Sequence, residues 1–215
     1  MEKYIEQTIT FVKKELKDAE AGHDWFHIER VYKNALNLLK TEEGNEQIVL
    51  LGALLHDIAD SKFHNGNETI GPKKAMDFMT LIDIDNEVKE HVVKIIENIS
   101  FKGGNFNRTF QSKELEIVQD ADRLDAIGAI GIARAFNYGG FKNRTIYNPS
   151  EKPKFGMTKE EYKKHEGSTI NHFYEKLLLL KNLMNTETGK KLAENRHQYM
   201  EDFLAQFYNE WNGKI

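Results

Sequence analysis

The chain has no cysteine among its 215 residues. Disulfide bonds and thiolate metal ligands are therefore excluded, and any bound metal ion must be held by nitrogen and oxygen atoms. The chain also lacks an apolar run long enough to cross a bilayer or to form the core of a signal peptide, because charged residues interrupt its most hydrophobic stretches. We therefore expect a cytoplasmic protein with no membrane partner.

An excess of positive charge is absent as well, since 30 lysines and arginines stand against 34 aspartates and glutamates, for a net charge of -4. We expect no nucleic-acid partner, although a local group of cations could still bind phosphates. Neither an internal repeat nor a low-complexity tract is present. A hydrophobic fraction of 40% is sufficient for a core, so we expect one domain over residues 1–215, and the oligomeric state stays open.

No segment alternates apolar and polar residues as a strand does, whereas apolar residues recur with a helical period along most of the chain. We therefore predict an all-α, single-domain protein with additional C-terminal helices. The longest predicted loop is the segment 137–157, which is rich in glycine, asparagine, proline and cations. The predicted helices lie at about residues 5–16, 24–44, 46–59, 71–81, 88–99, 112–136, from 158 onward, 168–184 and 192–211.

The dipeptide His56-Asp57 lies inside an apolar helical run over residues 50–58. Burial of an unpaired carboxylate costs several kcal/mol, so such a group is neutralised, paired or bound to a metal. Two ligands are too few, because catalytic metal sites draw three or more from the protein. His27, in line with the apolar face of its helix, and Asp122 supply two more inward-pointing groups. We predict that His27, His56, Asp57 and Asp122 hold one divalent ion; the alternative is a buried polar network without an ion.

The order of these residues carries a resemblance. His27 followed by Arg30 and Val31, then His56-Asp57, then Asp122 resembles the H…HD…D signature of the HD-domain metal-dependent phosphohydrolases. The segments 23–25, 59–63 and 120–126 are similar to those of a bacterial subgroup that includes a manganese-dependent deoxynucleoside triphosphate pyrophosphohydrolase. The resemblance implies the helical HD-domain fold and one divalent ion, manganese being favoured and Mg, Co, Ni, Fe or Zn being possible.

Two carboxylates are candidate catalytic groups. Asp60 lies three residues after Asp57, at a position where related HD phosphohydrolases carry an acidic catalytic residue; it would orient the attacking water or exchange protons with it. The alternative is a carboxylate that faces solvent or pairs with Lys62. Asp125 shares a helix face with Asp122, and the alternative is that it holds a ligand histidine or an arginine in place.

Phosphate groups require cations nearby, and several are available around the predicted centre. The candidate substrate-binding residues are Lys62, Arg30, Arg123, His91 and Arg144. For His91 the alternative is core packing. We expect a metal-binding core at about 20–137 and C-terminal helices at 158–212. The loop 137–157 between them is either a lid or an ordinary connection.

The resemblance therefore implies a nucleotide phosphohydrolase that converts deoxynucleoside triphosphates to monophosphate and pyrophosphate, with a small-molecule nucleotide as the partner. One alternative is a nucleoside monophosphatase or cyclic-nucleotide phosphodiesterase that uses the same ion. Another is a non-catalytic nucleotide-sensing module with a metal-stabilised core. Base preference and the cleaved bond stay open.

Overall fold

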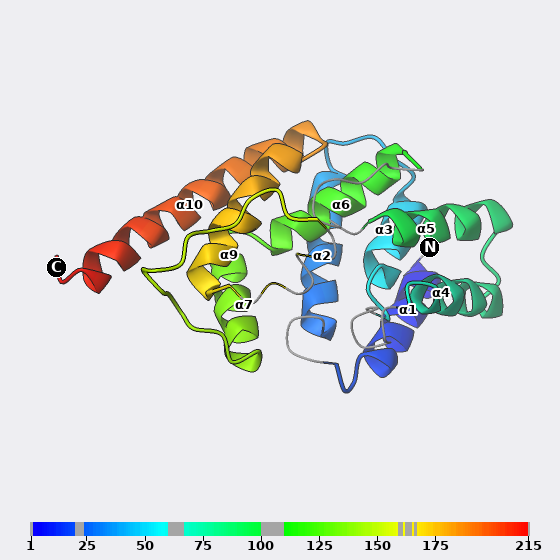
Figure 1. The fold of residues 1–215 in the computed structure, drawn as a ribbon. Coiled ribbons are helices and arrows are strands. Elements are labelled where there is room, and N and C mark those ends of the chain that lie inside the picture. Colours follow the sequence, from blue (N-terminus) through cyan, green and yellow to red (C-terminus); the bar gives the residue numbers. More distant parts are fainter. Residues whose placement is uncertain are drawn as a thin grey trace. The chain divides into compact units, whose positions relative to one another are not determined.

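The computed structural model describes residues 2–19, 24–59, 67–99, 110–158, 161, 165 and 167–214. Over these ranges every regular element is a helix, which confirms the all-α prediction (Figure 1). The elements are α1 Glu2–Glu15, α2 Trp25–Leu38, α3 Glu46–Leu55, α4 Ile70–Leu81, α5 Asn86–Asn98, α6 Lys113–Asp125, α7 Gly128–Phe141, α9 Thr169–Glu175, the 3₁₀ helix η2 Leu177–Leu183, and α10 Glu187–Trp211.

The chain divides into two compact units, Met1–Asp122 and Arg123–Ile215. In the first unit, α3 is the central helix, because it packs against α1, α2 and α5, and α4 packs against α5. All residues from Ile48 to Leu55 are buried. A Cβ atom added at Gly52 would lie 3.3 Å from Val118 of α6 and 3.4 Å from Ile95 of α5, so these helices approach α3 closely.

Helix α3 ends earlier than the sequence pattern predicts, at Leu55 rather than Ala59, and residues 56–59 form turns. The His56 side chain offers a physical reason. Its Nδ1 lies 2.9 Å from the carbonyl oxygen of Ala53, which in a longer helix would accept from the N–H of Asp57. The side chain therefore satisfies a carbonyl at the helix end, and the chain is free to turn beside His56 and Asp57.

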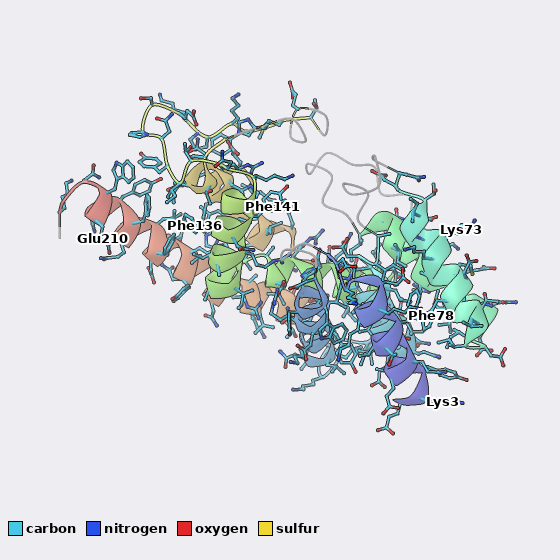
Figure 2. All side chains as sticks on the ribbon, turned by 90° about the horizontal axis from the view of Figure 1, so that it is seen from below. Lys3, Lys73, Phe78, Phe136, Phe141 and Glu210 are labelled. Atoms are coloured by element: carbon cyan, nitrogen blue, oxygen red, sulfur yellow. The ribbon has the colours of Figure 1, made fainter. Side chains whose placement is uncertain are left out.

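In the second unit, α10 packs against α7 and η2, and α9 packs against α7 and η2. The Phe136 ring of α7, labelled in Figure 2, lies 6.0 Å from Phe173 of α9 and 5.9 Å from Phe203 of α10 between ring centroids. In the first unit Phe78 of α4, also labelled there, stacks on Phe11 of α1 at 4.0 Å. Aromatic side chains thus fill the contacts between helices within each unit.

The predicted helix at 112–136 is two helices, α6 and α7, because the helical conformation is interrupted at residues 126 and 127, directly before Gly128. Gly128 has a φ of +73°, which a residue with a Cβ atom rarely adopts. A Cβ atom at Gly131 would lie 2.3 Å from the Ala126 carbonyl oxygen, so the turn also needs glycine there. Helix α7 continues to Phe141, so the first residues of the predicted loop 137–157 are helical.

The predicted helix at 168–184 is also two elements, α9 and η2, with Lys176 between them in a non-helical conformation (φ -142°, ψ -58°). The four consecutive leucines at 177–180 have no helical period, so the apolar pattern does not reveal the change to a 3₁₀ helix. Among the described helices, none combines the length and the apolar character needed to cross a membrane.

Candidate metal centre

His27 is placed by the N-terminal cap of α2. The Asp24 carboxylate accepts a hydrogen bond from the His27 backbone N–H at 3.0 Å, so Asp24 is the N-cap expected from its residue type. His27 therefore lies in the first turn of α2, on the face that carries Val31 and Ala35 into the core. Its side chain is only 3% exposed. A polar ring at this depth requires polar partners.

His56 and Asp57 follow the last residue of α3. With a proton on Nδ1, the His56 ring donates to the Ala53 carbonyl, and this leaves the lone pair of Nε2 free to bind a metal ion. The His56 side chain is buried and Asp57 is half-buried. The backbone hydrogen bond thus fixes both the tautomer and the direction of the ring.

His27, His56 and Asp57 converge, because each offers one ligand atom and these atoms all lie within 4.8 Å of one another. The two imidazole rings are 5.3 Å apart between centroids and stand at 74°. Asp122 of α6 lies beside them: its Oδ1 is 3.6 Å from Nε2 of His27 and 3.8 Å from Nε2 of His56. Three segments far apart in sequence, at His27, His56-Asp57 and Asp122, therefore bring two imidazoles and two carboxylates into one place within the first unit.

The spacing of these groups fits a divalent ion. Two donor atoms that each lie about 2.1 Å from an ion are about 3.0 to 3.4 Å apart, depending on the angle between the bonds. The 3.6 Å and 3.8 Å separations between Asp122 and the two imidazoles need only small side-chain rotations to reach that range. Imidazole nitrogen and carboxylate oxygen are ligands for Mn, Fe, Co, Ni and Zn alike. His27, His56 and Asp57 could therefore hold a metal ion.

The other candidate residues lie in different surroundings. Arg30 is half-buried on α2, one turn after His27. The nitrogen Nε2 of His91 lies 2.8 Å from the Ser112 hydroxyl and 3.5 Å from a Glu114 oxygen, which places His91 at the opposite end of α6 from Asp122. Asp60 and Lys62 lie outside the described residues. Their proposed roles stay predictions.

Three candidates, Asp125, Arg123 and Arg144, contact other residues of the second unit. The buried Asp125 carboxylate accepts from Arg134 Nη1 at 2.7 Å, which corresponds to the alternative that Asp125 holds an arginine. The Arg123 guanidinium donates to the Leu183 carbonyl, and Arg144 donates to the His165 carbonyl at 3.3 Å. Each of the three side chains therefore helps to hold segments of the second unit together.

The sequence pattern does not single out Asn34, although this residue touches the helix that carries Asp122. Its Nδ2 donates to the Ala121 carbonyl at 3.0 Å. The only local signal is a spacing of seven residues from His27, which places both on one face of α2.

Comparison with known proteins identifies the family. The model of the HD domain family matches residues 25–127, a range that contains His27, His56, Asp57 and Asp122. The chain is 36% identical over 212 residues to the uncharacterized protein YpgQ of Bacillus subtilis (strain 168), covering 98% of this chain and 95% of YpgQ. The chain therefore belongs to the HD domain family, which confirms the resemblance at that level.

Solved structures agree with this assignment. The crystal structure of an HD-superfamily hydrolase from Bacillus thuringiensis is similar with a TM-score of 0.77 and 46% identity, covering 98% of each chain. The crystal structure of Bacillus subtilis YpgQ in complex with ADP is similar with a TM-score of 0.74 and 34% identity, covering 96% of this chain and 97% of YpgQ. The chain is thus an HD-superfamily hydrolase.

Proposed function

We propose that this chain is a divalent-metal-dependent phosphohydrolase that acts on nucleotides and converts deoxynucleoside triphosphates to monophosphate and pyrophosphate. The observation that carries the proposal is the convergence of His27, His56, Asp57 and Asp122 within the first unit. The ADP bound to YpgQ supports a nucleotide as the ligand. The choice of a deoxynucleoside triphosphate rests on the resemblance to the pyrophosphohydrolase subgroup.

His27, His56, Asp57 and Asp122 would hold the ion, with manganese favoured by the same resemblance. When bound, a divalent ion supplies a site where the pKa of water falls from about 15.7 towards 7 and where a phosphoryl oxygen is polarised. The burial of His27 and His56 limits the access of bulk water to one side of the centre. The half-exposed Asp57 and Asp122 leave the other side for the substrate.

The residues outside the donor set bind and orient the reactants. Asp60 orients a water molecule and accepts its proton as the water oxygen bonds to the α-phosphorus. The bond between the α-phosphorus and the bridging oxygen breaks, and pyrophosphate leaves with the bonding electrons. Arg30 and Lys62 balance the charge of the phosphates. Arg123 and Asp125 also make structural contacts, with the Leu183 carbonyl and the Arg134 guanidinium respectively.

The test starts from protein freed of metal with a chelator. Mn²⁺, Mg²⁺, Co²⁺ and Ni²⁺ are added in turn to a panel of nucleotides, and the products are identified by ion-exchange chromatography. We expect deoxynucleoside monophosphate and pyrophosphate with Mn²⁺. Release of inorganic phosphate from monophosphates, or opening of cyclic esters, would instead identify the alternative hydrolases. Nucleotide binding with no turnover would identify a sensing module.

Two variants assign roles in the same assay. Asp57→Ala should abolish turnover and reduce bound Mn²⁺, because it removes a ligand. Asp60→Ala should retain Mn²⁺ and slow turnover by about 10²-fold, the lower range for a lost general base. The matched control is Asp77→Ala, since Asp77 is an exposed carboxylate of α4. Undiminished turnover by the Asp57 variant would overturn the proposal.

A further inference from the structure

The side-chain amide of Asn34 joins two helices that are distant in sequence. Its Nδ2 donates to the carbonyl oxygen of Ala121 at 3.0 Å, across a separation of 87 residues. Asn34 belongs to α2 and Ala121 to α6, and both lie in the first unit. Ala121 is buried and directly precedes Asp122. The hydrogen bond therefore anchors the turn of α6 from which the Asp122 carboxylate projects.

Asn34 also lies on the side of α2 that carries His27. Seven residues are almost two complete helical turns, so the two side chains differ by only about 20° around the helix axis and by about 10 Å along it. One face of α2 thus presents an imidazole 3.6 Å from Asp122 and an amide that holds the residue before Asp122. Helix α6 therefore meets this face of α2 at two places, the His27–Asp122 pair and the Asn34–Ala121 hydrogen bond.

A directional contact is needed here because apolar packing alone sets helix position loosely. Hydrophobic burial is non-directional, and a shift of α6 by one residue along its axis moves Asp122 by about 1.5 Å. Metal–ligand distances tolerate deviations of only about 0.2 Å. A second hydrogen bond, from Gln119 Nε2 to the Asn98 carbonyl at 3.0 Å, ties α6 to the end of α5, a helix that carries none of the four proposed ligands.

We propose that Asn34 is a positioning residue that sets the metal affinity of the centre by holding Asp122 in register with His27. The inference rests on the metal centre of the proposed function. Residues that orient metal ligands typically contribute 10- to 100-fold to metal affinity. Asn34 acts through the backbone of α6 rather than by contact with the ion or the substrate.

The test measures the affinity for Mn²⁺ alone by calorimetric titration. Asn34→Leu replaces the donating amide with an apolar side chain of similar size. Asn34→Asp removes the donor with almost no change of shape, so the proposal can still be tested if the leucine variant does not fold. We expect the Kd for Mn²⁺ to rise about 10- to 100-fold in both variants. Turnover should return towards the wild-type kcat when Mn²⁺ is raised to saturation.

The matched control is Asn37→Leu, because Asn37 is exposed on the same helix and its side chain accepts a hydrogen bond from Lys40 at 3.3 Å. It should bind Mn²⁺ as the wild type does. An Asn34 variant with a lowered melting temperature without metal but an unchanged Kd for Mn²⁺ would overturn the inference, since that result describes a purely structural residue. If the wild type itself binds no Mn²⁺, the metal centre of the proposed function fails instead.

Discussion

Asp122 supplies a negative charge directly beside two imidazoles, with its Oδ1 3.6 Å from His27 Nε2 and 3.8 Å from His56 Nε2. Asp122→Asn keeps the shape of the side chain and removes its charge. Because carboxylates bind divalent ions as anions, we expect the Kd for Mn²⁺ to rise by at least about 10-fold. Calorimetric titration measures the change. Asp85→Asn is the control at an exposed carboxylate, and an unaltered Kd in Asp122→Asn would remove Asp122 from the donor set.

The candidate centre could be predicted from sequence because its signal is local. His27, His56 and Asp57 are polar residues within apolar helical patterns, and burial of such groups demands a partner. The partners of Asp125 and Arg123 carry no such signal, because the Arg134 guanidinium and the Leu183 carbonyl reach them only through tertiary packing. Helical periodicity indicates which residues point inward, but it does not indicate which of them come into contact.

The first turn of α6 carries Glu114, which links this helix to the start of α3. A Glu114 carboxylate oxygen accepts from the Asn45 backbone N–H at 2.9 Å, and Asn45 is itself the N-cap of α3. Burial raises the pKa of Glu114, but the backbone N–H groups of Asn45 and Glu114, the charge of His91 and the Ser112 hydroxyl outweigh it. The pKa therefore lies below the ordinary value of 4.5.

A lowered pKa means that ionised Glu114 stabilises the folded state at pH values above about 4.5, its ordinary value, and that this contribution is lost as the pH falls through the folded-state pKa. We expect Glu114→Gln to lower the free energy of unfolding by roughly 1 kcal/mol at pH 7, and the difference from the wild type to shrink at more acidic pH. Urea unfolding at pH 7, 5, 4 and 3.5 measures this. Glu90→Gln, at an exposed carboxylate, should show no such trend, and a difference for Glu114→Gln that grows on acidification would contradict the sign.

Helix positions could be predicted better than helix ends. The N-caps Asp24 and Asn45 stand where α2 and α3 begin, since capping depends on residue type. The end of α6 could not be predicted from the sequence pattern, because Asp122, Asp125 and Ala129 continue the same helical periodicity. The glycines Gly128 and Gly131 are required there by backbone geometry, which the pattern does not show. The end of α3 could not be predicted either, because the His56 side chain takes the place of a backbone N–H group at the Ala53 carbonyl.

The division into two compact units places the whole candidate centre in one of them. His27, His56, Asp57 and Asp122 belong to Met1–Asp122, whereas α7, α9 and α10 belong to Arg123–Ile215. A single domain over residues 1–215 stays a prediction. Two separately opening units and one cooperative domain predict different effects of a bound ligand. A ligand stabilises only those opening reactions that disrupt its site.

Binding of Mn²⁺ should therefore act unevenly along the chain. At a free concentration about 100 times the Kd, a ligand stabilises its site by about 2.7 kcal/mol, which slows exchange through site-breaking openings by about 100-fold. We expect this slowing for backbone amides of α2 and α3, with much smaller changes in α10, and hydrogen exchange measured by mass spectrometry resolves the two regions. Asp57→Ala should abolish the effect. Equal slowing in α10 would instead support the single cooperative domain, and no slowing in α2 or α3 would contradict a metal centre built from His27 and His56.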